Sequence, residues 1–207
     1  MPFYIEALSS LAVFGGELLS NASSVGAALP SSRALTRRIA ACLPLRPEGY
    51  VIELGAGTGA VTQALLEHGV PPDKLVPVEI SEKMVRHLRR RFPRLNVLGG
   101  DAAKLDALLA QHLPNVRGHV SHIVSSLPLR SLPLPLVARI IREVQRLLSS
   151  HGTFIQYTYN LTTDRYRPLD AFQRHSTSLV WMSLPPARVD MFRPLPRVTK
   201  PPKPSRS

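Results

Sequence analysis

The chain contains very little cysteine, few acidic residues and no long apolar run, and each shortage excludes a class of protein. Its 207 residues include one cysteine, Cys42, so no disulfide can form within the chain. Cys and His residues are not clustered at the spacing of metal ligands, which argues against structural zinc or another bound metal. We therefore expect a metal-free protein that resides in the cytoplasm.

The acidic residues number 14 against 26 Lys and Arg, which gives a net charge of +12 and a pI of about 10.8. Such a surface attracts phosphate-rich partners, either nucleic acid or an anionic bilayer. The charge by itself does not choose between these two partners.

No segment has the roughly twenty mostly apolar residues that cross a bilayer, and no basic start with a cleavage site predicts a secretory signal. Residues 1–24 instead predict an amphipathic helix that lies in a membrane interface. Its broad apolar face holds Phe3, Tyr4, Leu8, Leu11, Phe14 and Leu18. The polar face lacks Lys and Arg, so an ordinary helix packed on the core remains the alternative.

The segment Val51–Gly59 is the most informative feature that is present, because an apolar strand leads directly into three alternating glycines. Gly55, Gly57 and Gly59 allow a sharp turn whose backbone can approach a ligand without a Cβ in the way. Dinucleotide-binding turns space their glycines as G-x-G-x-x-G, whereas the spacing here is G-x-G-x-G. The spacing favours S-adenosylmethionine as the cofactor.

Two further acids follow in the expected order, Glu79 at the end of a second apolar strand and Asp101 after Gly99-Gly100. Together with the glycine turn, these residues resemble the class I S-adenosylmethionine-dependent methyltransferases. The resemblance implies that Glu79 contacts the ribose hydroxyls, that Asp101 and Ala102 contact the adenine, and that Ile80 also binds the cofactor. It also implies that Glu53 orients the glycine turn or the methionine amino group.

Strands and helices alternate along the chain, which is typical of a doubly wound, Rossmann-like α/β sheet. We predict strands at 51–54, 75–79, 95–98, 119–125 and 153–159, with helices at about 58–68, 81–91, 104–112 and 134–149. Two late segments, 179–184 and 188–192, resemble the antiparallel C-terminal hairpin of the mostly parallel methyltransferase sheet. The expected methyltransferase domain covers residues 25–195, and 196–207 form a basic, Pro-rich tail.

The methyl acceptor is expected at Ser125-Ser126-Leu127-Pro128-Leu129, which follows the fourth strand at the ligand edge of the sheet. Enzymes that methylate amino groups of nucleic-acid bases carry Asn or Asp, then Pro, then an aromatic residue here. No aromatic residue follows Pro128, so the surface on which a base would stack is missing. This segment, together with Leu29-Pro30-Ser31-Ser32, resembles the peripheral bacterial phospholipid N-methyltransferases, which convert phosphatidylethanolamine toward phosphatidylcholine.

The resemblance implies roles for particular residues, with S-adenosylhomocysteine as the second product. Tyr159 and Ser126 are the candidate catalytic residues, and Ser125 is expected beside the cofactor. Candidate substrate-binding residues are Ser31, Ser32, Arg33, Leu127, Pro128, Tyr157, Arg165 and Arg167. Core or rim packing is the alternative for both tyrosines, and a solvated loop is the alternative for Arg165 and Arg167.

We thus expect a monomeric enzyme, peripherally bound to the inner face of the cytoplasmic membrane, whose partners are anionic lipid and its phospholipid substrate. The main alternative is a nucleic-acid methyltransferase similar to the rRNA adenine N6-dimethyltransferases. A membrane-binding protein that kept the cofactor fold without activity is the second alternative.

Overall fold

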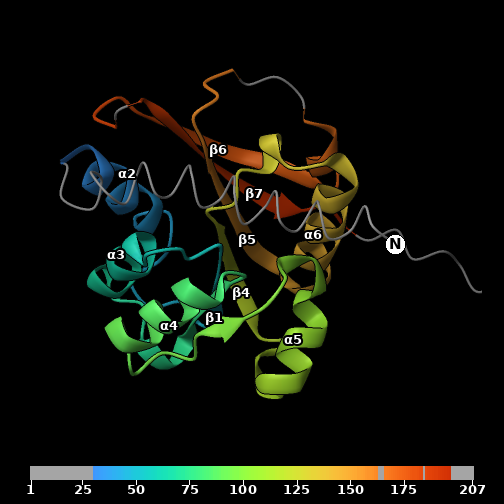
Figure 1. Cartoon of the computed structure of the whole chain (residues 1–207). Coiled ribbons are helices and arrows are strands. Elements are labelled where there is room, and N and C mark those ends of the chain that lie inside the picture. Colours follow the sequence, from blue (N-terminus) through green and yellow to red (C-terminus); the bar gives the residue numbers. More distant parts are fainter. Residues whose placement is uncertain (1–29, 163–165, 184, 197–207) are drawn as a thin grey trace, which may run out of the picture.

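The computed structural model describes residues 30–162, 166–183 and 185–196, which form a seven-stranded sheet in the order β3-β2-β1-β4-β5-β7-β6 (Figure 1). The first five strands are parallel, and β7 runs antiparallel to both β5 and β6. This arrangement confirms the predicted Rossmann-like sheet with an antiparallel C-terminal hairpin. The strands are β1 Tyr50–Leu54, β2 Leu75–Glu79, β3 Leu98–Gly99, β4 Val120–Ser125, β5 Leu148–Thr158, β6 Phe172–Val180 and β7 Ala187–Pro194.

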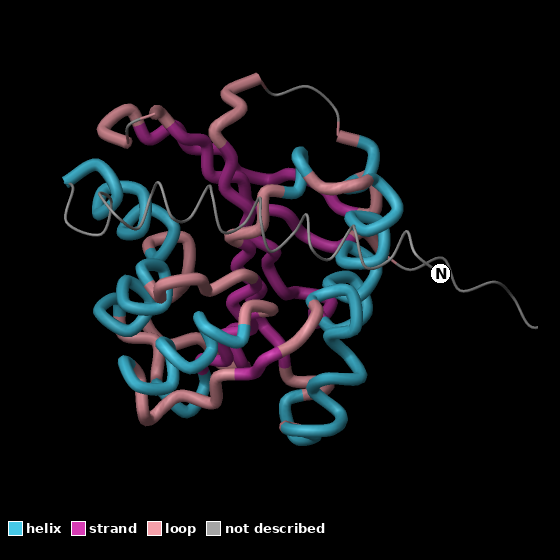
Figure 2. The backbone as a smooth tube through the Cα atoms, in the orientation of Figure 1, coloured by secondary structure: helices cyan, strands magenta, loops and turns pink. Residues whose placement is uncertain are grey.

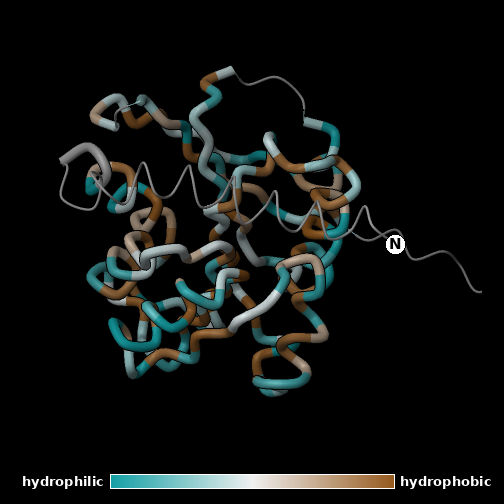
Figure 3. The backbone as a smooth tube through the Cα atoms, in the orientation of Figure 1, coloured by the Kyte–Doolittle hydropathy of each residue, from teal (hydrophilic) through white to brown (hydrophobic). Residues whose placement is uncertain are grey.

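Helices cover both faces of this sheet, as Figure 2 shows. One face carries α2, α3 and α4, and the other carries α5 and α6 (Figure 1). The helices are α2 Pro30–Ala40, α3 Ala60–His68, α4 Glu82–Arg91, α5 Leu105–His112 and α6 Leu134–Leu147. Along the helices, hydrophobic and hydrophilic residues alternate (Figure 3), because each helix buries only one face against the sheet.

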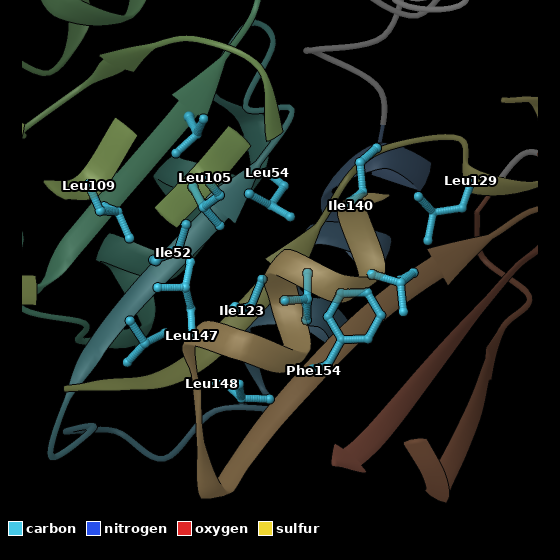
Figure 4. Close-up of a cluster of buried hydrophobic side chains, with 14 of the residues drawn as sticks. Ile52, Leu54, Leu105, Leu109, Ile123, Leu129, Ile140, Leu147, Leu148 and Phe154 are labelled. Carbon is cyan, nitrogen blue, oxygen red and sulfur yellow. The ribbon is translucent and has the colours of Figure 1, made fainter. Parts of the chain in front are cut away.

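The core has two parts, one on each face of the sheet. Ile52 and Leu54 of β1 point toward α5 and α6, whereas Val51 points toward α2 and α3. The α6 side is anchored by Phe154 of β5, which is fully buried (Figure 4). These two layers fix the strands so that β1, β2, β4 and β5 end at one common edge.

Two local predictions are wrong. The strand predicted at 95–98 is reduced to Leu98–Gly99. The first hairpin strand is Phe172–Val180 rather than 179–184. It is an edge strand of mostly polar, partly exposed residues, so no apolar run marks it.

Several predictions concern residues outside the described part. The helix at residues 1–24 and the tail from residue 197 onward are among them, as is Arg165. In residues 30–162, 166–183 and 185–196, no helix is long and apolar enough to cross a membrane. The same ranges contain no group of three or more His, Cys, Asp or Glu side chains that could hold a metal ion.

Candidate active site

The glycine turn lies at the end of β1 and leads into α3. Gly55 and Gly59 adopt left-handed backbone conformations, with φ of 72° and 83°, which residues with a Cβ rarely adopt. Space is also restricted at both positions. A Cβ at Gly55 would lie 2.7 Å from Cδ2 of Leu127, and one at Gly59 would lie 2.5 Å from Cε2 of Phe92. The positive φ therefore favours glycine at both positions, and at Gly59 the buried ring of Phe92 also leaves no room for a Cβ.

Glu79, the last residue of β2, is tied to this turn. The backbone N–H of Gly57 donates to its Oε2 at 2.9 Å, and that of Ser81 donates to its Oε1 at 2.8 Å. Each carboxylate oxygen still has lone-pair capacity for another donor. The carboxylate is thus held in a fixed orientation in which it can accept hydrogen bonds from two neighbouring hydroxyl groups. Ile80 follows it and is 38% exposed, so an apolar side chain is available beside the carboxylate.

Asp101 stands on the adjacent strand, just past β3. Its Oδ1 accepts the N–H of Ala103 at 2.8 Å and so starts the short 3-10 helix Ala102–Lys104. The N–H of Gly100 donates to the carbonyl oxygen of Glu79 at 2.9 Å. The structure therefore brings the predicted Glu79, Asp101 and Ala102 to one edge of the sheet, on adjacent strand ends.

Glu53 lies inside β1 and is completely buried. The hydroxyl of Thr62 donates to its Oε2 at 2.6 Å, while its Oε1 has no hydrogen-bond partner among the described residues. Burial raises the pKa of Glu53 to about 8; the Thr62 hydrogen bonds oppose this shift, and the charge of Glu79 adds to it. The carboxyl is therefore mostly neutral at pH 7, and a nearby cation would stabilise its ionised form.

Thr62 is a site residue that the sequence did not reveal. It is fully buried on α3, one turn after the glycines. The available signal was a hydroxyl on the apolar face of the predicted helix 58–68, which needs a partner when it is buried.

Tyr157, Tyr159 and Ser126 form an aromatic and hydroxyl cluster on the α2 and α3 side of the sheet. The two tyrosine rings meet edge to face, with centroids 6.0 Å apart. Burial raises the pKa of Tyr157. The charges of Tyr159 and Glu53 raise this pKa further, whereas the nearby Ser126 hydroxyl lowers it. Ser126 nevertheless makes no side-chain hydrogen bond of normal geometry within the described residues, although its Oγ is buried. Tyr159 is 51% exposed, so the cluster opens to solvent at that end.

The loop after β4 is fixed by backbone and side-chain hydrogen bonds. Ser126 N–H donates to Leu54 O at 2.9 Å, and Leu127 N–H donates to the Ser125 hydroxyl at 3.3 Å. Gln156 of β5 donates from Nε2 to Leu127 O at 3.0 Å and to Tyr157 O at 2.7 Å. Gln156 was not predicted as a site residue. A buried amide within an otherwise apolar strand was the signal that could have found it.

The predicted substrate residues are not all brought together. Leu127 and Pro128 lie in the loop described above. Arg33 is exposed on α2, whereas Arg167 is exposed in a short turn that packs against α6, across the sheet from Arg33. Ser31 and Ser32 are in the first turn of α2, and their side chains are outside the described part.

Comparisons with known proteins agree with this geometry. The family model described as "Methyltransferase domain" matches residues 51–152. An ornithine lipid N-methyltransferase from Singulisphaera acidiphila is 31% identical over 151 residues, which cover 70% of this chain and 76% of that protein. A ribosomal RNA small subunit methyltransferase A from a Synechococcus strain is 35% identical over 115 residues. That match covers 51% of this chain and 39% of the relative.

Solved structures show the same fold at low sequence identity. A 1,6-didemethyltoxoflavin-N1-methyltransferase from Burkholderia thailandensis, solved with S-adenosylhomocysteine, has a TM-score of 0.65 and 16% identity. The match covers 92% of this chain and 88% of that one. A TehB-like methyltransferase from Corynebacterium glutamicum has a TM-score of 0.60 and 14% identity, over 90% and 100% of the two chains.

Proposed function

The chain belongs to the class I S-adenosylmethionine-dependent methyltransferases, and from that premise we propose that it methylates the primary amine of a membrane-lipid headgroup. The proposed substrate is phosphatidylethanolamine, with its mono- and dimethylated derivatives as later substrates toward phosphatidylcholine. The proposed place of action is the inner face of the cytoplasmic membrane, where the protein would bind peripherally. The cofactor supplies an electrophilic methyl group on a sulfonium; the acceptor must supply an amine with a free lone pair.

The residues at the strand ends suit this cofactor. Glu79 would accept hydrogen bonds from the ribose hydroxyls, since each of its fixed oxygens retains lone-pair capacity. Asp101 and Ala102 would contact the adenine, with Ile80 packing beside the ring. Glu53 would face the positively charged methionine end. There its Oε1, which has no hydrogen-bond partner in the described part of the chain, gains a donor and its carboxyl ionises.

The cluster of Tyr157, Tyr159 and Ser126 is the single observation that carries the acceptor assignment. The buried Ser126 hydroxyl, which makes no side-chain hydrogen bond of normal geometry within the described residues, would accept a bond from a small amine. The neighbouring tyrosine rings present faces that attract a cation more strongly as it becomes methylated. The loop residue after Pro128 is Leu129, which is buried and aliphatic. A flipped base therefore finds no stacking partner at its usual place.

The proton of the ammonium must leave before the nitrogen can attack the methyl carbon in line. Burial raises the pKa of both tyrosines, so neither supplies a phenolate at neutral pH. We assign Tyr159 and Ser126 to holding the amine by ring face and hydroxyl oxygen. The proton then passes to water at the exposed side of Tyr159.

The relatives include a lipid methyltransferase and several RNA methyltransferases. The lipid enzyme is 31% identical over 70% of this chain, and an rRNA methyltransferase is 28% identical over 82% of it, so the preference for a lipid rests on the loop after Pro128. Ornithine and ethanolamine headgroups share a primary amine, so both lipids are compatible with the cluster. The net charge of +12 suits any anionic partner and does not discriminate.

The test is methyl transfer from labelled S-adenosylmethionine to vesicles of phosphatidylethanolamine with phosphatidylglycerol, beside parallel reactions with ornithine lipid and with ribosomal RNA. Phase extraction separates the products. Label in methylated phosphatidylethanolamines is the expected result. Label in ornithine lipid alone would move the substrate within the lipid class, and label in RNA alone would refute the proposal.

A matched pair of variants tests the tyrosine cluster. Tyr159→Ala removes the aromatic wall and should lower kcat/KM by roughly tenfold or more, in line with a cation–π contact of about 1–2 kcal/mol. Tyr159→Phe keeps the ring and should retain much more activity. Tyr50→Phe is the control, because Tyr50 begins β1 at the opposite edge of the sheet. Equal losses in Tyr159→Ala and in the control would exclude the assigned role.

A further inference from the structure

The turn between β6 and β7 exposes a group of large apolar side chains. Leu179 is 45% exposed, Trp181 is 67% exposed and Met182 is 76% exposed. These residues are almost contiguous in the chain and stand at the tip of a hairpin. Soluble proteins expose single apolar residues often, but a tryptophan and a methionine side by side at a projecting tip mark a contact surface.

The tip lies at the same edge of the sheet as the active site. The last residue of β6, Val180, pairs with Ala187 of β7. Thr158, the last residue of β5, pairs with Arg188 of β7, so the β6–β7 turn lies beyond the end of β5. Tyr159 follows β5 at that edge. Figure 1 shows the end of the hairpin extending beside α2, away from the centre of the sheet. A surface that binds this tip would therefore also face the acceptor site.

The charges around the tip are of one sign. The described part of α2 contains Arg33, Arg37 and Arg38, all exposed, and no acidic residue. Arg38 donates a hydrogen bond to the hydroxyl of Ser178, so this basic helix lies against the hairpin. The acid in the described hairpin strands is Asp190, which is 2% exposed and bonded to a neighbouring guanidinium. The apolar tip is thus bordered by cations and by no exposed carboxylate of the hairpin strands.

We propose that the β6–β7 turn inserts Trp181 and Met182 into the interface of an anionic lipid bilayer, with the arginines of α2 on the adjacent headgroups. Tryptophan favours the interfacial region, and basic residues are attracted to anionic lipid. The inference rests on the proposed lipid substrate, and it adds a second attachment point distinct from residues 1–24. Insertion places the Tyr159 side of the sheet against the lipid surface.

Trp181 is the single tryptophan of the chain, so intrinsic fluorescence reports on this position alone. The probe is a titration of the full-length protein with vesicles of phosphatidylethanolamine and phosphatidylglycerol. We expect a blue-shifted emission and quenching by brominated acyl chains, both weaker at high salt. Unchanged emission overturns the proposal, whether or not the protein sediments with the vesicles. A blue shift that grows with protein concentration without lipid would assign the tip to a second copy instead.

Variants separate membrane attachment from catalysis. Trp181→Ala and Met182→Ala should each weaken vesicle binding, the former by roughly tenfold, from the apolar area the indole would bury. Leu45→Ala is the control, since Leu45 is 68% exposed but lies before β1 at the opposite edge. Equal losses in the control and the tip variants overturn the assignment.

Methyl transfer is measured both on vesicles and on detergent-dispersed lipid. The tip variants should raise KM for vesicles while leaving transfer to dispersed lipid unchanged. If the unaltered protein transferred no methyl group to lipid in vesicles or in detergent, the proposed function would be refuted. That result is distinct from a failure of the tip to insert.

Discussion

Glu53→Gln should make the protein more stable than the unaltered chain at pH 8.5 and leave the two nearly equal at pH 4. The carboxyl of Glu53 is fully buried, with a pKa raised from 4.5 to about 8. In the unfolded chain it loses its proton near pH 4.5. The folded state thus binds more protons between these two values, and the free energy of unfolding falls as the pH rises through this window.

The size of the effect follows from the two pKa values. Each pH unit inside the window costs about 1.4 kcal/mol, so the complete interval from 4.5 to about 8 corresponds to about 5 kcal/mol as an upper limit. Local relaxation and water entry reduce this value. Glutamine cannot ionise, and its carbonyl oxygen can still accept the hydrogen bond from Thr62. The variant therefore removes the pH-dependent cost while keeping the shape of the site.

The assay is urea unfolding without cofactor, with both proteins measured at half-unit steps from pH 4 to 9. Comparing the two proteins matters because His122 titrates in the opposite sense. Burial lowers its pKa to about 4, so its contribution to stability rises with pH from about 4 to 6.5. His122 is present in both proteins and cancels in the difference. Parallel stability profiles from pH 5 to 8.5 would refute the assignment of a neutral, buried Glu53.

Three further results are expected. Glu79→Ala should abolish S-adenosylmethionine binding in calorimetry with little effect on vesicle binding. Deletion of residues 1–20 should weaken vesicle binding and leave S-adenosylmethionine binding intact, and loss of both properties in both variants would contradict this division. Asp190→Asn should lower the free energy of unfolding by about 3–5 kcal/mol, because it leaves the buried Arg188 guanidinium without its charge partner. Urea unfolding measures this change, and a loss below about 1 kcal/mol would show that the ion pair is replaceable. Gly59→Ala should destabilise the folded protein by at least about 1 kcal/mol and weaken cofactor binding, since the φ of Gly59 is 83° and Phe92 occupies the space of a Cβ. Calorimetric melting measures the stability and cofactor titration the binding; wild-type values in both would mean that the turn can shift.

The hairpin shows where sequence patterns fail. The apolar run at Leu179–Met182 predicted a strand, yet β6 ends at Val180 and the rest of the run is the exposed turn. Strand patterns assume that apolar residues are buried. The exposed tip violates that assumption, so the predicted strand at 179–184 lies too far along the chain compared with β6 at Phe172–Val180. The same violation is what identifies the tip as a contact surface.

The sequence by itself determined the fold class and the cofactor, and it predicted which residues bind that cofactor. These features depend on local spacing: glycines that allow positive φ, and acids placed directly after apolar strands. The tertiary structure decided which side chains act together. Thr62 reaches Glu53, Gln156 holds the loop at Leu127, and Arg38 meets Ser178 across long separations in the chain. Such contacts are set by strand order and by which face each residue occupies, and no short pattern in the sequence encodes them.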